Sequence, residues 1–312
     1  MKRVAVIGAG TMGHGLALVH AIGGCQVNLF DINPVVLGQA QKLISAACAT
    51  LVHAGVHQQA DIDAVQSRIK QSSNIANAVK NAELVVEAVV EKKGVKRSVF
   101  AEIAKFADSN AIIVSNTSYL DVFSLLPNGL GIKTLIAHWY TPPYIIDLVD
   151  IAPGPETDQK YIIKVRDLYK KFGKAPLVFE KLIQGYIANR LQSAMNLECL
   201  NMIDKGLASA EDIDYSIRHG LASRLAVLGH MQKMDFTGIE MARNALASRV
   251  YIPPKPTGAS ITLNRLIEEG RTGVMSGAGH YDYGNIPAEK LLEIRDLKLL
   301  KMKKVIKDIE GE

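Results

Sequence analysis

Residues 3–24, RVAVIGAGTMGHGLALVHAIGG, decide the fold that we expect for this chain. The first five form an apolar run typical of a buried parallel strand, and the small and apolar residues at the other end favour a helix. Between them, Gly8, Gly10 and Gly13 have the spacing GxGxxG. This arrangement joins a strand end to a helix N-terminus and is typical of a dinucleotide-binding βαβ unit.

Each glycine of this motif has a physical task. Gly8 permits the tight turn, Gly10 lets a pyrophosphate approach the backbone, and Gly13 lets the helix pack closely on the strand. The free N–H groups at the start of the helix would then face the phosphates. We therefore predict that these glycines, with Thr11 and Met12 between them, bind the cofactor.

The next apolar segment, QVNLFD at residues 26–31, ends in a carboxylate that indicates which dinucleotide binds. Asp31 lies eighteen residues beyond Gly13, where an acidic side chain can accept hydrogen bonds from the ribose. Its charge would repel a 2′-phosphate, and residues 32–36, INPVV, include no arginine to bind one. We predict NAD as the cofactor, and a glycine-rich turn without a nucleotide is the alternative.

Strand-like and helix-like segments continue to alternate up to residue 179. Residues 34–70 look like a helix pair around a turn near Gly55, and residues 96–107 look like another helix. The segments predicted as strands are 82–91, 111–118, 133–139, 145–151 and 174–179. This rhythm predicts an α/β fold with a Rossmann-type, doubly wound parallel sheet. Glu91, Asn116, Ser118 and His138 fall at or just after strand ends, where such sheets bind ligands.

The stretch 137–151, AHWYTPPYIIDLVDI, indicates a proton-transfer site. Its two prolines enforce a bend, so the apolar segment after them would return as a strand beside the first. Asp147 and Asp150 are three positions apart and point to opposite faces of that strand. Asp150 has apolar neighbours, as an inward carboxylate would, and we expect Asp147 to be the solvated one. Asp150 would fix the tautomer of His138 and make it a general base, while a buried structural histidine is the alternative.

Six motifs, taken together, resemble the L-3-hydroxyacyl-CoA dehydrogenase family over nearly the whole chain. They are VIGAGTMGHGLA, LVVEAVVEKKGVK, VSNTSYL, HWYTPPYIIDLVDI, GYIANRL and GRTGVMSGAGHYDYG. The proline pair and PPYIIDLVDIAPGPET are most similar to the branch that holds lambda-crystallin/L-gulonate 3-dehydrogenase.

The resemblance implies roles for residues at matched positions. His138 would be the catalytic base, and Asp150 takes the place of the family's glutamate partner. Ser118 and Asn189 would contact the substrate oxygen or the surroundings of the histidine. A further matched pair, Glu91 and Lys96, would lie near the cofactor and substrate cleft.

Three departures from the family pattern bear on the substrate. Asp150 is one methylene shorter than glutamate, so the backbone must come closer or a water must bridge the gap. Thr141 stands where an asparagine is usual, and His280 stands where phenylalanine is common. These changes leave the fold expectation intact and put the acyl-CoA substrate in question.

The remaining chain predicts a second, all-α domain. From GYIANRL onward, apolar residues recur every three or four positions, Gly206 ends one helix, and SAED at 209–212 is typical of a capping box. Further helices would break at Gly220 and Gly229, the segment 268–284 would be a connecting loop, and 289–309 would form an amphipathic helix. We predict an NAD-binding domain over residues 1–183 and a helical substrate and dimerisation domain over residues 184–312, with a homodimer implied by the resemblance.

Composition and charge narrow the class of protein. A chain of 312 residues suggests about two domains, and its net charge of +5 is small. The lysine-rich segment KLLKMKKVIK has no aromatic residues interleaved, so we expect no nucleic-acid partner. Three separated cysteines favour free thiols in a reducing compartment over a metal site. With no signal segment and no apolar stretch near the roughly 20 residues that span a bilayer, we expect a cytoplasmic protein without a membrane partner.

Three functions remain open. The first is NAD-dependent oxidation of the hydroxyl of a 3-hydroxyacyl-CoA, with Lys92, Lys93, Lys96 and Arg97 near the CoA phosphates or simply on a solvated helix face. The second is the same chemistry on a free hydroxy acid or sugar acid, whose carboxylate Arg224 would bind, with a surface ion pair as the alternative role of Arg224. The third is a non-catalytic NAD-binding structural protein, against which His138, Ser118 and Asn189 argue.

Overall fold

The computed structural model describes residues 1–311, and the chain forms two compact units, Met1–Ile187 and Ala188–Glu312. This division lies four residues after the predicted boundary between 183 and 184. Each unit has its own architecture, and the functional residues are described within the unit that carries them.

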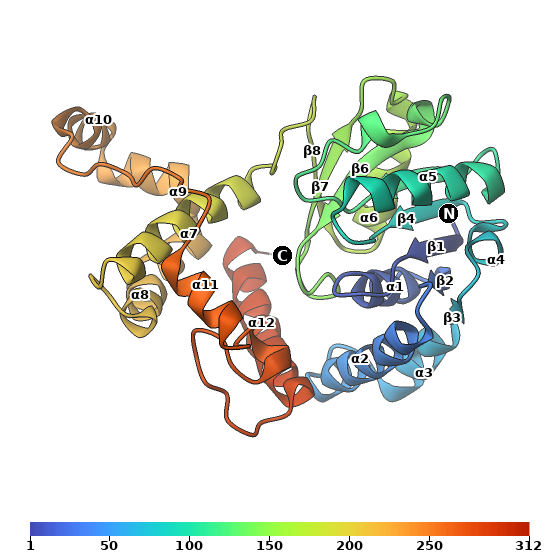
Figure 1. Ribbon diagram of the computed structural model, residues 1–312, viewed down its shortest axis with the longest axis horizontal. Helices are drawn as coiled ribbons and strands as arrows, with labels where there is room; N and C mark the ends of the chain where they lie inside the picture. Colours follow the sequence, from blue (N-terminus) through green and yellow to red (C-terminus); the bar gives the residue numbers. More distant parts are fainter. Residues whose placement is uncertain (312) are drawn as a thin grey trace. The chain divides into compact units, whose positions relative to one another are not determined.

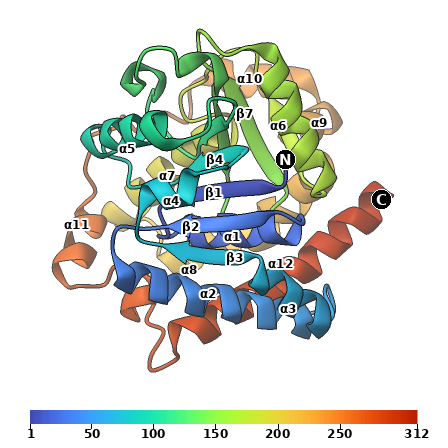
Figure 2. The same ribbon diagram turned by 90° about the vertical axis from the view of Figure 1, so that its right-hand side faces the viewer.

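The first unit is built on one eight-stranded sheet in the order β3-β2-β1-β4-β5-β6-β7-β8. All neighbouring strands run parallel except β6 and β7, which pair antiparallel. The strands are β1 Arg3–Ile7, β2 Gln26–Phe30, β3 Ile69–Ser72, β4 Leu84–Glu87, β5 Ile112–Ser115, β6 Thr134–Trp139, β7 Leu148–Pro153 and β8 Ala175–Val178. Figure 2 shows β4, β1, β2 and β3 side by side in that order. The doubly wound, mostly parallel sheet predicted from the sequence is confirmed.

Both faces of this sheet are covered, which explains why its central strands are mostly apolar. In β1, Val4 and Val6 belong to one core cluster, and Ala5 and Ile7 belong to the other. The helices of this unit are α1 Gly13–Ile22, α2 Pro34–His53, α3 Gln59–Ser67, α4 Ile75–Val79, α5 Lys93–Phe106 and α6 Gln159–Lys171 (Figure 1). Residues of α1, α2, α3 and α6 pack in the first cluster, and residues of α4 and α5 pack in the second.

Edge strand β3 was missed, because residues 34–70 were expected to be helical throughout. The helix pair α2 and α3 exists, yet the chain leaves α3 at Ser67 and pairs Ile69–Ser72 with β2. The sequence of β3, IKQS, has half-exposed or exposed side chains and no apolar alternation. An edge strand that buries few side chains shows no alternation of apolar and polar residues in its sequence, so it cannot be predicted from that pattern.

Helix α2 corrects the expectation about apolar stretches. It has 20 residues, and an 18-residue window reaches a mean hydropathy of 1.4, so its length and composition would allow it to cross a membrane. Its buried residues, however, include Leu37, Ala40, Ile44 and Ala47, which recur at three- and four-residue intervals in the first core cluster. This spacing is that of an amphipathic helix packed by one face on a protein core.

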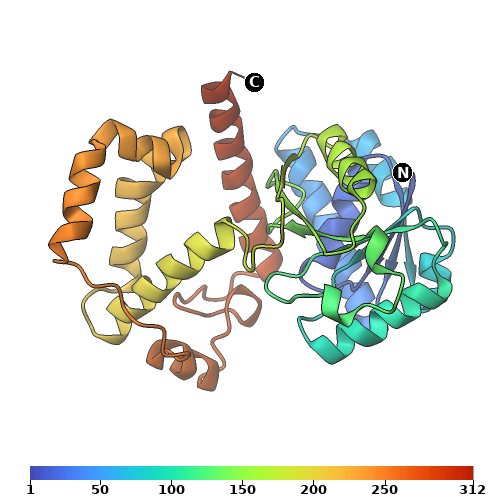
Figure 3. The same cartoon turned by 90° about the horizontal axis from the view of Figure 1, so that it is seen from above.

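The second unit consists of helices and connecting loops, drawn in yellow to red in Figure 3. Its helices are α7 Ala188–Asp204, α8 Ala210–Ser216, α9 Ser223–Thr237, α10 Ile239–Ser248, α11 Ile261–Glu268 and α12 Ala288–Glu310. The predicted capping box is confirmed, since the Ser209 hydroxyl accepts from the Asp212 N–H and the Asp212 carboxylate accepts from the Ser209 N–H. Gly229 does kink α9, but Gly220 lies in a π-helical turn that continues α8 into α9 without a break.

Candidate active site

The glycine-rich loop between β1 and α1 has the geometry that its spacing predicts. Gly8 has a φ of 103°, and a Cβ there would lie 2.7 Å from the Ala88 carbonyl oxygen. A Cβ on Gly13 would lie 1.7 Å from the Gly8 carbonyl oxygen, so only glycine allows this helix to start so close to the strand. A Cβ on Gly10 would meet nothing within 4 Å. The loop is thus crowded behind Gly8 and Gly13 and open in front of Gly10, as a close-lying pyrophosphate requires.

A cavity of about 880 Å³ opens beside this loop within the first unit. Its lining includes Ser118 and seven predicted cofactor residues, which are Gly8, Gly10, Thr11, Met12, Asp31, Glu91 and Asn116. Gly13 and Lys96 do not line it. Much of the remaining wall is apolar, from Phe30, Ile32, Val36, Ile75, Ala88, Val89, Val90, Val95 and Val99. An apolar cleft with a few convergent polar groups is what a dinucleotide site requires.

Asp31 ties the end of β2 to the glycine-rich loop. Its Oδ2 accepts a hydrogen bond from the Ala9 N–H at 2.9 Å, and its Oδ1 accepts one from the Asn33 N–H at 2.9 Å. Each carboxylate oxygen can accept a second hydrogen bond. Asp31 can therefore hold the loop and still receive the ribose hydroxyls at the cavity wall.

A buried ion-pair network supports the loop that carries Ser118. Lys96 Nζ lies 2.7 Å from Glu87 Oε1 and 3.2 Å from Glu91 Oε2, and Lys96 is 1% exposed. Glu91 Oε1 accepts hydrogen bonds from the Thr117 hydroxyl at 2.5 Å and the Ser118 N–H at 3.0 Å. Burial raises the pKa of Glu91, but the hydrogen bond from Thr117 and the charge of Lys96 outweigh it, so this pKa is lowered. The ionised Glu91 thus shapes the loop, and Lys96 is too buried to meet a CoA phosphate.

Asn116 connects the end of β5 to the histidine strand. Its Oδ1 accepts a hydrogen bond from the Trp139 N–H at 2.8 Å, one residue after His138. Because Asn116 also lines the cavity, it fixes the end of β6 relative to the cofactor cleft.

His138 contacts Ser118, which lines this cleft, and faces Asp150 with its other ring nitrogen. The antiparallel register places His138 directly opposite Asp150, so their side chains share a face of the sheet. The Ser118 Oγ lies 3.3 Å from His138 Nε2, while Asp150 Oδ2 lies 3.8 Å from His138 Nδ1. The carboxylate is fully buried and the imidazole is 4% exposed. The pairing predicted from the sequence is present, and the gap expected from the shorter aspartate separates the two groups beyond hydrogen-bond distance.

Two tyrosines that the sequence reading did not single out complete the surroundings of His138. Tyr186 stacks on the imidazole, with ring centroids 4.7 Å apart and planes at 28°, and its hydroxyl donates to the Thr117 carbonyl at 2.7 Å. Tyr140 meets the imidazole edge-on, also at 4.7 Å, and its hydroxyl donates to Asp150 Oδ2 at 2.5 Å. Burial and the neighbouring Asp150 charge raise the pKa of both phenols, which therefore stay protonated. Their positions, two residues after the histidine and just past Gly185, are the only signals in the sequence.

Asp147 differs from its expected role as a solvated carboxylate. Its Oδ1 lies 3.2 Å from Lys174 Nζ, which also donates to the carbonyls of Pro143 and Ile146 at 2.8 and 2.9 Å. Lys174 is buried, and the Asp147 side chain is 26% exposed. Asp147 therefore helps to neutralise a lysine that holds the bend after the two prolines.

The remaining predicted site residues lie in the second unit. Asn189 is in the first turn of α7. Arg224, considered for carboxylate binding, is exposed and donates from Nε to the Gly220 carbonyl at 2.8 Å. Neither residue lines the cofactor cavity.

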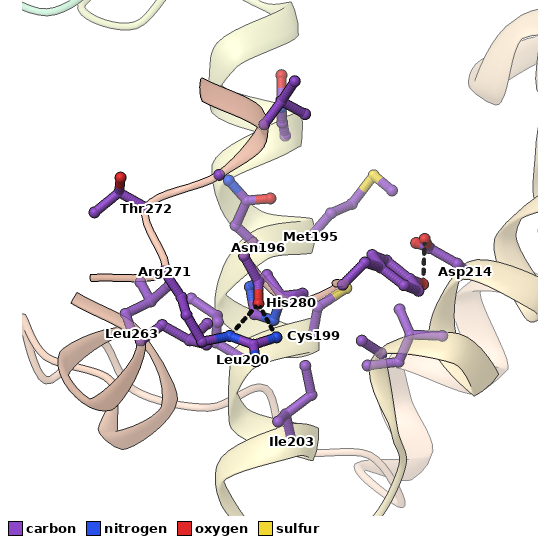
Figure 4. A pocket seen from close by; sticks show the side chains of 18 of the residues that line it. Met195, Asn196, Cys199, Leu200, Ile203, Asp214, Leu263, Arg271, Thr272 and His280 are labelled. Atoms are coloured by element: carbon purple, nitrogen blue, oxygen red, sulfur yellow. Dashed lines mark hydrogen bonds between the residues drawn. The ribbon is translucent and has the colours of Figure 1, made fainter. Parts of the chain in front are cut away.

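The segment 268–284, expected to be only a connecting loop, forms one wall of a cavity of about 1140 Å³ in the second unit. Figure 4 shows Met195, Asn196 and Cys199 of α7 facing this loop. Arg271 holds the loop in shape by donating from Nε and Nη2 to the Gly279 carbonyl at 3.1 and 2.8 Å (Figure 4). The Tyr281 hydroxyl anchors it to α8 by donating to Asp214 Oδ2 at 2.8 Å.

A dinucleotide cleft that ends at a histidine paired with a carboxylate defines the site of an NAD-dependent dehydrogenase. Family models agree with this class. Residues 3–182 match the NAD-binding domain of 3-hydroxyacyl-CoA dehydrogenase, and residues 185–283 match its C-terminal domain. The chain belongs to the 3-hydroxyacyl-CoA dehydrogenase family and is an NAD-dependent oxidoreductase.

The relatives include hydroxyacyl-coenzyme A dehydrogenases and also dehydrogenases named for substrates without CoA. The chain is 27% identical to the 5-formyl-3-hydroxy-2-methylpyridine 4-carboxylate 5-dehydrogenase of Mesorhizobium japonicum, over 99% of this chain and 100% of that one. A solved structure of an NAD⁺-dependent enzyme of this name is similar with a TM-score of 0.85, 25% identity and coverage of 98% and 99%. The human lambda-crystallin homolog is 32% identical over 74% of this chain and 73% of its own. L-carnitine dehydrogenase of Oceanobacillus iheyensis is 32% identical over 76% of each chain.

Proposed function

We propose that His138 is the general base that takes the hydroxyl proton when this enzyme oxidises its substrate. The observation that carries this proposal is the contact of 3.3 Å between His138 Nε2 and Ser118, which itself lines the cofactor cavity. The negative charge of Asp150 beside Nδ1 favours a proton on that nitrogen, so Nε2 is the nitrogen that accepts the substrate proton. Asp150 then stabilises the imidazolium that forms.

The other residues of the first unit hold this arrangement. The Ser118 hydroxyl, 3.3 Å from His138 Nε2, would form a hydrogen bond with the substrate oxygen that loses its proton to Nε2. Asn116 fixes the strand end, and Tyr186 covers the open face of the imidazole and keeps water from it. Bound NAD⁺ supplies the hydride acceptor. In the reverse direction, the protonated His138 returns its proton to the new hydroxyl oxygen.

For the substrate, we propose a small hydroxy acid that carries no CoA. The likeness to a pyridine-carboxylate dehydrogenase supports a substrate without CoA, since that structure matches with a TM-score of 0.85, whereas a 3-hydroxyacyl-CoA dehydrogenase covered over its full length reaches 0.65. The burial of Lys96 also removes one of the four cations available for CoA phosphates. A 3-hydroxyacyl-CoA is the second candidate, which the two matched family domains favour.

A substrate panel decides between these candidates. NADH formation would be measured with 3-hydroxybutyryl-CoA, with free 3-hydroxybutyrate, and with hydroxy acids such as carnitine, gulonate and aromatic hydroxymethyl carboxylates. The proposal predicts kcat/KM at least ~100-fold higher for one of the free acids, the scale that buried polar recognition reaches. The reverse order would assign the protein to acyl-CoA oxidation.

We also propose that the protein is a homodimer joined through its second unit. Helices α7, α9 and α10 bury none of their residues, and large apolar side chains such as Leu191, Met231 and Phe236 are 57%, 69% and 76% exposed. Exposed apolar surface on this scale is typical of an interface. The variant Met231→Lys with Phe236→Lys should be monomeric by light scattering, while Val56→Lys, at a half-exposed valine of the first unit, should not change the mass. A monomeric wild type would contradict the proposal.

A further inference from the structure

Tyr140 and His138 are held on the same side of the chain and meet at one carboxylate. Tyr140 directly follows β6, two positions after His138, and the two rings meet edge-on with centroids 4.7 Å apart. Asp150 on β7 faces both side chains. Its Oδ2 lies 2.5 Å from the Tyr140 hydroxyl and 3.8 Å from His138 Nδ1. The carboxylate oxygen that should orient the histidine is thus in closer contact with the tyrosine.

Asp150 has few alternatives to this hydrogen bond. It is fully buried, and its Oδ1 accepts no hydrogen bond from any residue within the described part of the chain. A buried carboxylate without a donor is costly, so the phenol O–H stabilises the ionised form. With this hydrogen bond in place, Oδ2 lies 3.8 Å from the imidazole Nδ1, beyond hydrogen-bond distance.

The geometry points to Tyr140 as a positioning residue that holds Asp150 at a distance from His138 and takes part of its negative charge. This inference rests on the proposed role of His138 as general base. A full hydrogen bond from imidazole to carboxylate would stabilise the imidazolium and keep the histidine protonated to higher pH. With Tyr140 bound to Oδ2, that stabilisation of the imidazolium is weaker.

The other titratable groups near this pair form hydrogen bonds with other partners. Tyr186, stacked on His138, donates its hydroxyl to the Thr117 carbonyl. Glu91 accepts from Thr117 and from the N–H groups of Ser118 and Tyr119. A change at Tyr140 therefore acts on the Asp150–His138 pair first.

The test is the variant Tyr140→Phe, which removes the hydroxyl and keeps the ring. In this variant Asp150 can turn toward Nδ1, so the titration midpoint of the His138 ring, followed by NMR, should rise by about 0.5–1 pH unit. The acid limb of the pH profile of kcat/KM for oxidation should move to higher pH by the same amount. At pH values below this limb, kcat/KM should therefore fall about 3- to 10-fold. The matched control is Tyr161→Phe on α6, which should move neither midpoint. The His138 resonance is assigned by its loss in His138→Gln.

Two outcomes would overturn the inference. One is a folded Tyr140→Phe protein whose His138 midpoint stays unchanged or falls, and the other is an equal shift in Tyr161→Phe. If Tyr140→Phe does not fold, Asp150→Glu provides the second test, because the longer side chain reaches Nδ1 directly and should raise the same midpoint. An unchanged midpoint there would also overturn it. The NMR titration needs no turnover, so an inactive enzyme would contradict the proposed function and leave this test standing.

Discussion

Replacement of the buried histidine His20 should remove part of the acid sensitivity of the first unit. His20 lies on α1 with no exposed surface, and its ring packs among Trp139, Tyr169 and Phe172 with centroids 5.7 to 5.9 Å away. Its Nδ1 bonds to the Leu16 carbonyl at 2.7 Å. Burial disfavours the charged ring more than this hydrogen bond favours it, which lowers the pKa from 6.5 to about 4.

The sign and size of the effect follow from linkage. Between pH 6.5 and about 4 the unfolded chain carries a proton on His20 that the folded protein lacks, so stability falls as the pH falls through this window. Two pKa values this far apart imply a loss of about 2 kcal/mol between pH 7 and pH 5, and about 3 kcal/mol by pH 4. Above pH 7 the contribution no longer changes.

The assay is urea unfolding followed by Trp139 fluorescence at pH 7 and pH 5. Trp139 is the only tryptophan of the chain and contacts His20, so its signal reports on the first unit. In His20→Leu, which fills the site with an uncharged side chain, the loss between the two pH values should be about 2 kcal/mol smaller than in the wild type. Equal losses in both proteins would refute the reasoning, whatever their stabilities at pH 7.

Further predictions concern the cofactor cleft and the loop beside it. Gly13→Ala should destabilise the first unit by about 3 kcal/mol or prevent folding, since its Cβ would overlap the Gly8 carbonyl, whereas Gly10→Ala should change the melting temperature little and weaken NADH binding at least ~10-fold. Titration calorimetry and thermal melts separate the two, and equal stabilities would contradict the packing argument. Asp31→Asn keeps an acceptor but removes the charge, so the preference for NAD over NADP should fall at least ~10-fold in kinetic assays; an unchanged preference would show that Asp31 does not discriminate. Glu91→Gln should cost about 1–3 kcal/mol by urea unfolding, because it weakens the charge-assisted hydrogen bonds to the Ser118 loop; a neutral effect would assign that loop another support.

The parts of the fold that follow from sequence are those with strong local rules. Few backbone conformations satisfy the spacing of Gly8, Gly10 and Gly13, and most positions of the strands buried on both faces are apolar. It could also be anticipated that His138 and Asp150 face each other, since side chains point alternately to the two faces of a strand that returns beside the first. Strand β3 could not, because a polar edge strand carries no hydrophobic period.

The contacts that could not be anticipated depend on tertiary packing. Lys96 looks like a surface cation in a lysine-rich segment, yet it is buried against Glu87 at the end of β4, a partner that the sequence does not indicate. The hydrogen bond of 2.5 Å from Tyr140 to Asp150 depends on how closely the residue after β6 approaches β7. Sequence spacing indicates which face a residue occupies, and it does not indicate which of two neighbours a carboxylate binds.

The turnover of His138→Gln tests the central claim most directly. Glutamine keeps a polar side chain of similar size but cannot accept the substrate proton, so kcat should fall at least ~100-fold. NADH binding, measured by energy transfer from Trp139, should stay within about twofold of the wild type, since His138 does not line the cofactor cavity. A variant that binds NADH and turns over within about tenfold of the wild type would show that another group removes the proton.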